Sequence, residues 1–551
     1  MKSSHTIKDS GTSRRMFSPG WIYLSVALFN PAIAVAQNAI DVGSRKQLFI
    51  DHKFIESAEG IRLVLNPPHQ SREKLVVADQ PWERDGWVAS YSTVIQENGK
   101  IRMWYQISAG TPEPGKNPPM MGVAYAESTD GLQFTKPVLR LVERDGSREN
   151  NLVLPPDLNL MTVGGCTIWR DDNPKCPADA RYKTWMKIYP KKESGIRGPH
   201  RVFTSPDGLK WKLDERPVTG LRAADTQPSW FWDPRVSRYV GYSREWIRES
   251  AGFGARMASY NESDDIVNWD SAEMSIELDE RDMAAAPVAR VDLSSATVRG
   301  ENVLPPKKRN AGGGTIEEDQ VLTPTAPLDF YGPGVFPYEG VYVALSPVFY
   351  HWRMDGRESW PGTSDLRLSV SRDGRHFTSP DGRRPFLTPG PDGSWDSKWI
   401  YPVLRPVRMG DQMWIYYFGM NRDHSHRLDR AATKEETGIS RAVMRMDGFI
   451  SADADYEGGT LLTPPMQFTG SRLELNIDTG AGGTARVEIL EQSGKRIDGF
   501  SFHESDEINA NRVRQVVTWL GNPDVSKLAG KSVRLRIRMR SAKLYAFQFA
   551  G

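Results

Sequence analysis

The chain has 551 residues and a nearly balanced charge, with 71 lysines and arginines against 69 aspartates and glutamates. This length allows more than one domain, and the formal net charge of +2 argues against a general nucleic-acid-binding protein. No stretch after the N-terminus keeps a 3.6-residue apolar period, so a helical fold is excluded.

Residues 1–36 have the pattern of an export signal. Paired arginines at 14–15 precede an apolar run over 21–29, and the small residues 34–36 form a cleavage site. A twin-arginine signal and an ordinary secretory signal both fit this pattern. We therefore expect a periplasmic or secreted protein that begins at Gln37 and does not contact the membrane once the signal is removed.

A phrase of the form Ser-x-Asp-Gly-x-x-aromatic recurs along the chain. Copies stand at 128–134, 205–211 and 371–377, with a degenerate copy at 263–269 and a remnant at 445–449. Asp-Gly favours a tight turn, because Asp bonds its own backbone and Gly accepts a positive φ. The repetition predicts a supersecondary unit that occurs five times, with each Asp-Gly turn in a structural role on the outside of its unit.

An aromatic, β-branched segment precedes each copy of the phrase. These segments are 101–106, 181–186, 238–242, 341–345 and 413–417. Each is flanked by further strand-like runs, so each unit reads as a meander of about four antiparallel strands. Radial packing of five such sheets would bury their faces, which predicts an all-β fold with a five-bladed β-propeller over 37–456. An irregular all-β sandwich is the alternative.

From about Glu457 the phrase stops and short strands with alternating apolar and polar residues follow. This pattern predicts a C-terminal β-sandwich over 457–551, either a carbohydrate-binding module or a module that stiffens the propeller. Residues 281–328 lack a pattern and read as a solvated insertion or as a loop over the propeller mouth. Cys166 and Cys176 form a disulfide or remain thiols.

Carboxylates precede the first strands of four units. Asp225 and Asp329 precede those of units three and four, Asp396 precedes that of unit five, and Glu83 and Asp85 precede that of unit one. In a propeller the first strand of each blade lines the axis, and its N-terminal end opens on the face where pockets form. These side chains are therefore expected to converge at one mouth.

The second strands end near the same face and add candidate substrate-binding groups. They contribute Arg244, His351 and His424, while Trp399 adds an aromatic surface next to Asp396. Arg244 is suited to a bidentate contact with a substrate carboxylate or sulfate. Asp85 is a further candidate for substrate binding.

Several carboxylates at one mouth suit glycoside hydrolysis, which needs a general acid and a nucleophile or base. We predict a glycoside hydrolase acting on a poly- or oligosaccharide, with Asp225 and Asp329 as the central pair and Glu83 and Asp396 next. The roles of acid and base, the sugar and the oligomeric state stay open. No cofactor and no nucleic-acid partner are expected, although a structural or pocket calcium is compatible with the sequence.

Two other functions fit the same residues. A non-catalytic carbohydrate-binding propeller would keep the aromatic lining but lack a close carboxylate pair. A lyase or a metal-assisted enzyme would use the histidines of the mouth, His351 and His424.

The chain resembles the five-bladed propeller glycoside hydrolases of families 32, 43, 117 and 130. It is most similar to exported bacterial "family-32-like" proteins that carry a C-terminal β-sandwich, on stretches such as Leu48–Asp51, Arg102–Tyr105, Asp329–Gly332 and Leu544–Phe549. The resemblance implies acidic residues at the starts of inner strands. The position of the family-32 nucleophile holds a serine here, Ser90 or Ser92, so a fructosidase is not supported.

Overall fold

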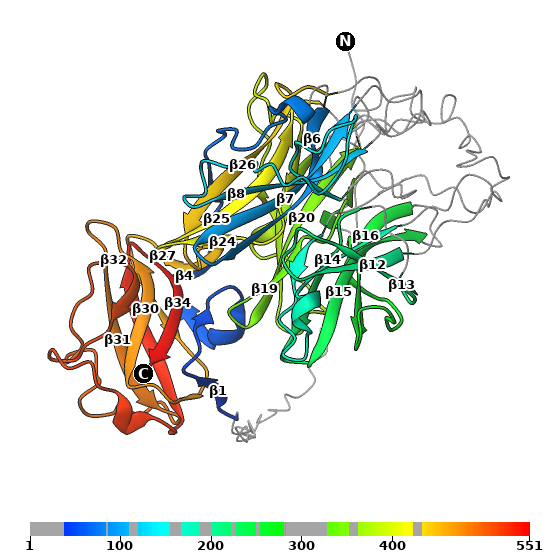
Figure 1. Cartoon of the computed structure of the whole chain (residues 1–551). Helices are drawn as coiled ribbons and strands as arrows, with labels where there is room; N and C mark the ends of the chain where they lie inside the picture. Colours follow the sequence, from blue (N-terminus) through cyan, green and yellow to red (C-terminus); the bar gives the residue numbers. More distant parts are fainter. Residues whose placement is uncertain are drawn as a thin grey trace, which may run out of the picture. The chain divides into compact units, whose positions relative to one another are not determined.

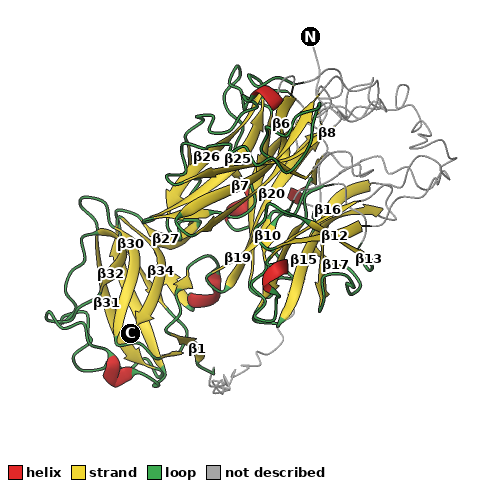
Figure 2. Cartoon of the chain, viewed as in Figure 1, coloured by secondary structure: helices red, strands yellow, loops and turns green. Residues whose placement is uncertain are grey.

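Short strands joined by turns make up almost all of the regular structure (Figures 1 and 2). The computed structural model describes residues 38–83, 86–109, 120–154, 167–187, 200–221, 226–248, 254–279, 281–282, 328–351, 362–422 and 432–551. Within these ranges the 3-10 turns are η1 (His52–Phe54), η2 (Pro81–Glu83), η3 (Ala178–Ala180), η5 (Asp381–Arg383) and η7 (Ser526–Leu528). No helix in the described ranges is long and apolar enough to cross a membrane.

The first three blades of the propeller are four-stranded antiparallel sheets whose strands follow chain order. Blade I holds β6 (Gly86–Glu97), β7 (Lys100–Ala109), β8 (Met120–Ser128) and β9 (Leu152–Leu154). Blade II holds β10 (Trp169–Arg170), β11 (Tyr182–Lys187), β12 (His200–Ser205) and β13 (Lys212–Pro217). Blade III holds β14 (Ser229–Asp233), β15 (Arg238–Arg248), β16 (Gly254–Ser263) and β17 (Glu273–Ile276).

The last two blades share a ten-stranded sheet, because one parallel pairing, Ser364 with Trp399, connects them. Blade IV holds β18 (Leu328–Phe330), β19 (Val335–Tyr338), β20 (Val341–His351), β21 (Gly362–Ser371) and β22 (Pro385–Leu387). Blade V holds β23 (Trp399–Pro402), β24 (Val407–Met409), β25 (Gln412–Met420), β26 (Thr437–Arg445) and β5 (His69–Gln70). In both blades the inner strand is interrupted, and its two halves pair with the same second strand.

The expected five-bladed propeller is confirmed, and the aromatic segments form its second strands β7, β11, β15, β20 and β25. No pattern in the sequence indicated how blade V is completed. Its outermost strand is β5, which comes from before blade I and pairs with Ala442 and Val443 of β26. The ring is thus closed by a strand from the N-terminal side of the chain.

The Asp-Gly turns connect neighbouring blades. In blade I, Asp130 accepts hydrogen bonds from the backbone of Leu132 and Gln133, and Gly131 adopts φ +74°. The Gly131 carbonyl accepts a hydrogen bond of 2.8 Å from the Tyr416 hydroxyl, which belongs to blade V. The aspartate therefore acts within the turn, as predicted, while an aromatic side chain of the preceding blade contacts the turn from outside.

The same contact recurs at two further boundaries. Trp104 of blade I donates to the Gly208 carbonyl of blade II over 2.8 Å, and Tyr242 of blade III donates to the Gly374 carbonyl of blade IV over 2.7 Å. The repeated phrase therefore fixes how these blades pack on the ones before them.

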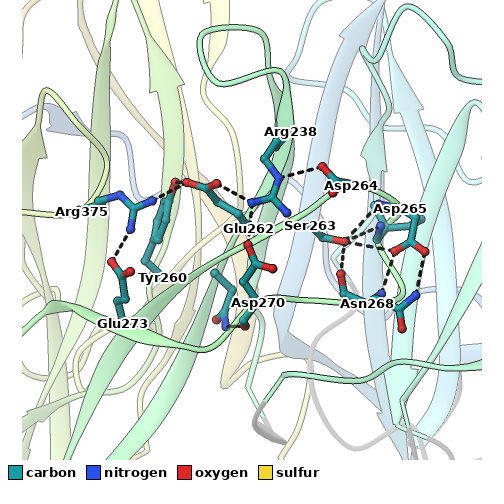
Figure 3. A network of polar contacts seen from close by, with 12 residues as sticks. Arg238, Tyr260, Glu262, Ser263, Asp264, Asp265, Asn268, Asp270, Glu273 and Arg375 are labelled. Atoms are coloured by element: carbon teal, nitrogen blue, oxygen red, sulfur yellow. Dashed lines mark hydrogen bonds and ion pairs between the residues drawn. The ribbon is translucent and has the colours of Figure 1, made fainter.

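Ion pairs surround the turn formed by the degenerate phrase of blade III (Figure 3). Arg238 bonds Glu262, Asp264 and Asp270 over 2.9, 2.8 and 2.6 Å. Arg375, from the phrase of blade IV, reaches across to Glu262 over 2.6 Å and also pairs with Glu273 (Figure 3). This network joins the outer parts of blades III and IV.

The C-terminal part is a β-sandwich of two sheets, as predicted. Sheet A holds β1 (Ile40–Gly43), β29 (Met466–Phe468), β33 (Val533–Arg540), β28 (Gly459–Leu462), β3 (Ser57–Glu59) and β31 (Thr484–Glu491). Sheet B holds β32 (Asn511–Val516), β30 (Arg472–Asp478), β34 (Ala542–Ala550), β27 (Ile450–Ala454), β4 (Ile61–Leu65) and β2 (Gln47–Leu48). The sandwich thus includes four strands from before residue 66 and one from 450–454, which lie ahead of the boundary expected at 457.

Sheet B carries contacts with the propeller. Phe336 and Phe449 share a hydrophobic cluster with Ile450 and Ala546 of this sheet. Arg445, at the end of β26, donates to the Asn476 side chain over 2.6 Å. The sandwich core lies between sheets A and B and is filled by residues such as Leu473, Val487, Leu535 and Phe547.

Candidate functional site

A cluster of charged and aromatic side chains lies where the first strands of the blades begin. We call it the axial cluster, and its members are Tyr91, Arg244, Arg256, Asp329, Tyr331, Phe349, Trp399 and Tyr401. Trp399 is the first residue of β23, Asp329 lies in β18, and Arg256 stands near the start of β16. Blades I, III, IV and V all contribute to the cluster.

Asp329 is the carboxylate of this cluster. It is completely buried, and Arg256 donates to its Oδ2 over 2.8 Å. Its backbone is fixed because β18 pairs with β20, which places Asp329 opposite Phe349. The strand pairing and the ion pair together hold the carboxylate in one position.

Arg244 brings a second buried guanidinium to the cluster. Its Cζ lies 5.4 Å from the centre of the Tyr331 ring, and that of Arg256 lies 5.3 Å from the same ring. Burial, followed by the charge of Arg256, lowers the pKa of Arg244, while Tyr331, Tyr91 and Asp329 act in the opposite direction. The cluster therefore concentrates positive charge beside Asp329.

Aromatic rings form the wall of the cluster. Tyr331 contacts Trp399 and Phe349 at centroid distances of 5.1 and 5.6 Å, and Phe349 contacts Trp399 at 5.0 Å. Tyr401 bridges to Tyr91 of blade I at 5.3 Å, and burial raises the pKa of its phenol. Tyr331, Phe349, Trp399 and Tyr401 are each at most 7% exposed, so these rings pack mainly on one another.

Three of the residues predicted for the site, Asp329, Arg244 and Trp399, therefore lie together. Three others, Asp225, Asp85 and His424, lie outside the described residues. His351 is the last residue of β20, opposite Gly362, and only its backbone is described.

Glu83 is held inside blade I. It is 1% exposed, and its Oε1 accepts a hydrogen bond of 2.8 Å from the Tyr105 hydroxyl. Its Oε2 accepts from Lys136 over 2.6 Å and from the backbone of Asp79 and Gln80. Both oxygens are thus bonded to blade I and to the backbone just ahead of η2, an arrangement typical of a structural carboxylate.

Asp396 is engaged in a similar way. It is completely buried and bonds Arg72 over 2.9 Å, Tyr417 over 3.0 Å and Ser394 over 2.8 Å. Because Arg72 closely follows β5, this ion pair fastens the closing strand to blade V. The bonds of Glu83 and Asp396 thus go to groups within or beside their own blades and not to members of the axial cluster.

Asp365 is a titratable group that the sequence reasoning did not single out. It lies in β21 opposite Val348, and its carboxylate accepts a hydrogen bond of 3.2 Å from Tyr350. Burial raises the pKa of Asp365 to about 7, although Arg367 and Tyr350 act in the opposite direction. No sequence signal marked it, because it stands inside an alternating strand rather than before one.

The Cys176 thiol lies beside a lysine side chain. The Lys183 ammonium group lies 3.1 Å from its sulfur, and Lys183 also pairs with Asp171 over 2.5 Å. Cys166 lies outside the described residues, and Cys176 is a free thiol in this structure. Among the described residues, no group of three or more His, Cys, Asp or Glu side chains is arranged to hold a metal ion.

No family model matches the chain. A curated relative is the A type blood N-acetyl-alpha-D-galactosamine deacetylase of Flavonifractor plautii, which is 28% identical over 151 residues, 25% of this chain and 19% of that protein. An uncharacterised protein of Mycobacterium tuberculosis is 27% identical over 179 residues, 31% of this chain and 51% of that protein. The chain thus spans at most about half the length of these relatives.

The solved structures that this chain resembles are of proteins named for several kinds of carbohydrate chemistry. An N-acetylgalactosamine deacetylase from F. plautii in complex with blood group B trisaccharide has 16% identity and a TM-score of 0.39 over 71% of this chain and 97% of its own. A beta-1,2-mannobiose phosphorylase from Listeria innocua has 11% identity and a TM-score of 0.39 over 70% and 98%. A GH43_1 enzyme from Xanthomonas citri has 11% identity and a TM-score of 0.36 over 67% and 94%.

Because these TM-scores are all below 0.5, the fold is assigned from the pairing of the strands in this structure. That pairing shows the expected five-bladed β-propeller. The chain is a five-bladed β-propeller joined to a β-sandwich, with a buried aspartate, two arginines and an aromatic wall where its inner strands begin.

Proposed function

We propose that the chain is an exported glycoside hydrolase that cleaves a poly- or oligosaccharide at the axial cluster, with Asp329 as one of its carboxylates. The observation that carries this proposal is the setting of Asp329, which is completely buried, held by Arg256 and next to an aromatic wall. Preorganised charge in a water-poor site is what stabilises an oxocarbenium-like transition state.

The arrangement suggests roles for the side chains. A guanidinium at hydrogen-bond distance favours a charged carboxylate, so Asp329 suits a base or nucleophile better than an acid. Trp399 and Tyr331 would offer ring faces to the sugar, and Arg244 would bind a polar substituent. Asp225 remains our proposed partner carboxylate, because it precedes Thr226, a buried residue just ahead of β14.

Glu83 and Asp396 take structural roles in this proposal. Their ion pairs with Lys136 and Arg72 hold η2 and the closing strand β5. Loss of Asp396 would remove the carboxylate partner of Arg72, and loss of Glu83 would leave the buried Lys136 with only the half-exposed Asp79 as its ion-pair partner, which is costly. Replacing Glu83 or Asp396 is therefore expected to reduce stability, and activity only as a consequence.

The proposal is tested by screening purified mature protein against plant and marine polysaccharides and measuring the release of reducing ends. Asp329→Asn is expected to lower kcat/KM by about 100-fold or more. Because it leaves the buried Arg256 beside a neutral side chain, it should also lower the melting temperature, so activity is compared at a temperature at which the variant is fully folded. Asp179→Asn, an exposed aspartate in η3 between β10 and β11, is the matched control and should keep full activity. Equal product release by wild type and Asp329→Asn would remove Asp329 from the mechanism.

A second candidate function is deacetylation of an N-acetylated sugar. It is favoured by the 28% identity to the Flavonifractor plautii deacetylase. Acetate release from N-acetylgalactosamine-containing glycans, without new reducing ends, would support the deacetylase and contradict the hydrolase.

Export through residues 1–36 is part of the proposal. The N-terminal sequence of the protein recovered from the periplasm or medium tests it, and Gln37 is the expected first residue. A chain that stays uncleaved in the cytoplasm would contradict export.

A further inference from the structure

Four arginines stand in a row on the outer face of the sandwich. In β33, Val533, Leu535, Ile537 and Met539 point into the core, so the alternate residues point outward. We call these the arginine row: Arg534, Arg536, Arg538 and Arg540. Three further outward residues of sheet A flank it, namely Thr460 of β28 and Arg486 on β31, both opposite Arg538, and Glu59 of β3 opposite Thr460.

The two ends of the row differ in their partners. Arg534 pairs with Glu56, and Arg536 pairs with Glu488 over 3.1 Å. Arg538 and Arg540 are exposed, and within the described part of the chain neither makes a side-chain ion pair or hydrogen bond. Arg538 is also directly opposite Arg486, whose own carboxylate partner is Glu507 at 3.5 Å.

Each of these two arginines instead lies near an aromatic ring. The Arg538 Cζ is 4.7 Å from the centre of the Phe502 ring, and that of Arg540 is 5.8 Å from the centre of Tyr456. Tyr456 is 74% exposed, which leaves most of its ring open to a ligand. A guanidinium beside a ring keeps the N–H donors at its edge available for bidentate bonds to an oxyanion.

The arginine row lies on a different sheet from the contacts with the propeller. Those contacts come from sheet B, through residues such as Asn476 and Ala546. The outward side chains of β33 belong to sheet A, on the far side of the sandwich core from sheet B. A ligand at Arg538 and Arg540 would therefore not compete with the packing of the sandwich on the propeller.

We propose that the outer face of sheet A, at Arg538 and Arg540, binds a linear polyanionic glycan through its carboxylate or sulfate groups. Alternate residues of a strand are about 6.7 Å apart, so the two guanidinium groups can each bind a separate charge of a single extended chain. Tyr456 adds an exposed ring for stacking on a sugar. The site is separate from the axial cluster and does not depend on catalysis there.

A glycan is a better candidate ligand than a nucleic acid, because the positive charge on this face is confined to a few residues. Glu59, Glu56, Glu488 and Glu507 share or border this face, and the chain as a whole carries only +2. A duplex, with its broad and uniform negative charge, would meet these carboxylates, whereas a narrow glycan chain need contact only Arg538, Arg540 and Tyr456.

The test is affinity electrophoresis of the mature chain in gels that contain dextran sulfate, polygalacturonate or neutral dextran. We expect the wild type to be retarded by at least one of the two polyanions and not by neutral dextran. The double variant Arg538→Ala, Arg540→Ala is expected to bind the retarding polyanion at least fivefold more weakly than wild type. Arg512→Ala with Arg514→Ala, which removes the same charge from the edge strand β32 of sheet B, is the matched control and should bind like wild type.

A third variant separates specific recognition from general attraction of charge. Arg538→Lys with Arg540→Lys keeps the charge but loses the planar donor fork, so it should bind nearly as weakly as the alanine pair. The proposal would be overturned if the lysine double variant were retarded as strongly as wild type, or if the two alanine double variants lost the same amount of retardation. Binding of duplex DNA as strong as that of the polyanionic glycans would also overturn it. Unchanged melting temperatures confirm that the variants are folded.

Discussion

At the scale of single residues, the buried carboxylates of this chain divide by their partners. Asp329, Glu83 and Asp396 each bond a cation, namely Arg256, Lys136 or Arg72. Asp365 instead accepts a hydrogen bond from a tyrosine hydroxyl, with no ion pair at bonding distance in the described structure. Burial therefore dominates its titration and raises its pKa to about 7.

This setting predicts a pH-dependent effect of Asp365→Asn. The pKa of Asp365 is higher in the folded than in the unfolded chain, so the wild type loses stability as pH rises from about 4 to 7. An asparagine side chain does not ionise, so the variant should gain stability relative to wild type across this window, on the order of 1–3 kcal/mol at pH 7. Thermal unfolding at several pH values measures this difference.

The control is Asp145→Asn, because the Asp145 side chain is 84% exposed. Its stability relative to wild type should not change in the same window. A constant difference between Asp365→Asn and wild type from pH 4 to 7 would contradict the burial argument.

At the scale of elements, the Asp-Gly turns determine how one blade packs on the next. Gly208 adopts φ +76°, and a Cβ at this position would lie 2.7 Å from the Trp104 ring of blade I. The turn thus needs glycine both for its backbone and for the close approach of the neighbouring blade.

Gly208→Ala is expected to destabilise the protein more than a glycine replacement that has only the backbone cost. Gly410→Ala is the matched variant, because Gly410 has φ +61° but open space around its Cβ. The free energy of unfolding of both variants should fall by about 1 kcal/mol because of the positive φ. That of Gly208→Ala should fall by about 1–3 kcal/mol more because of the clash with Trp104. Denaturant unfolding measures both, and equal losses would show that the contact between blades contributes nothing.

Sequence patterns were sufficient to predict the five blades, because each blade is marked by motifs that lie close together in the sequence. The phrase at 128–134 and the aromatic strand before it lie within one blade, so a repeat could be counted. The closing strand β5 has two residues, His69 and Gln70, and it pairs with Val443 and Ala442 far along the chain, so no local pattern marks the pairing. The strands β1–β4 of the sandwich were missed for the same reason.

The candidate site was predictable in part. Counting strands placed Asp329, Arg244 and Trp399 at one end of the propeller, where they lie together. The same count also selected Glu83 and Asp396, because it cannot show that Lys136 or Arg72 pairs with them. Arg256 and Tyr331 were missed, since nothing in the sequence marks an arginine or a tyrosine that completes a cluster from another blade.

At the scale of the whole molecule, the propeller and the sandwich are interleaved along the chain. β4 and β27 pair with each other in sheet B, and β27 pairs with β34 near the C-terminus. Residues 450–454 follow blade V directly, so the last strand of the propeller leads straight into the sandwich.

A chain ending at residue 456, the expected end of the propeller, is therefore predicted not to fold cooperatively. It would keep β2, β4 and β27 but lose β34, the strand that pairs with β2 and β27. Expression followed by thermal unfolding checks this against the full mature chain. A soluble fragment with a single sharp transition would contradict it.

The central claim is that a sugar binds at the axial cluster against Asp329. The most direct measurement is a crystal structure of the Asp329→Asn variant soaked with an oligosaccharide that the wild type cleaves. We predict a sugar ring in contact with Tyr331 or Trp399 and within hydrogen-bond distance of the residue at position 329. Sugar bound only on the sandwich, or at the opposite end of the propeller near the Asp-Gly turns, would contradict the account.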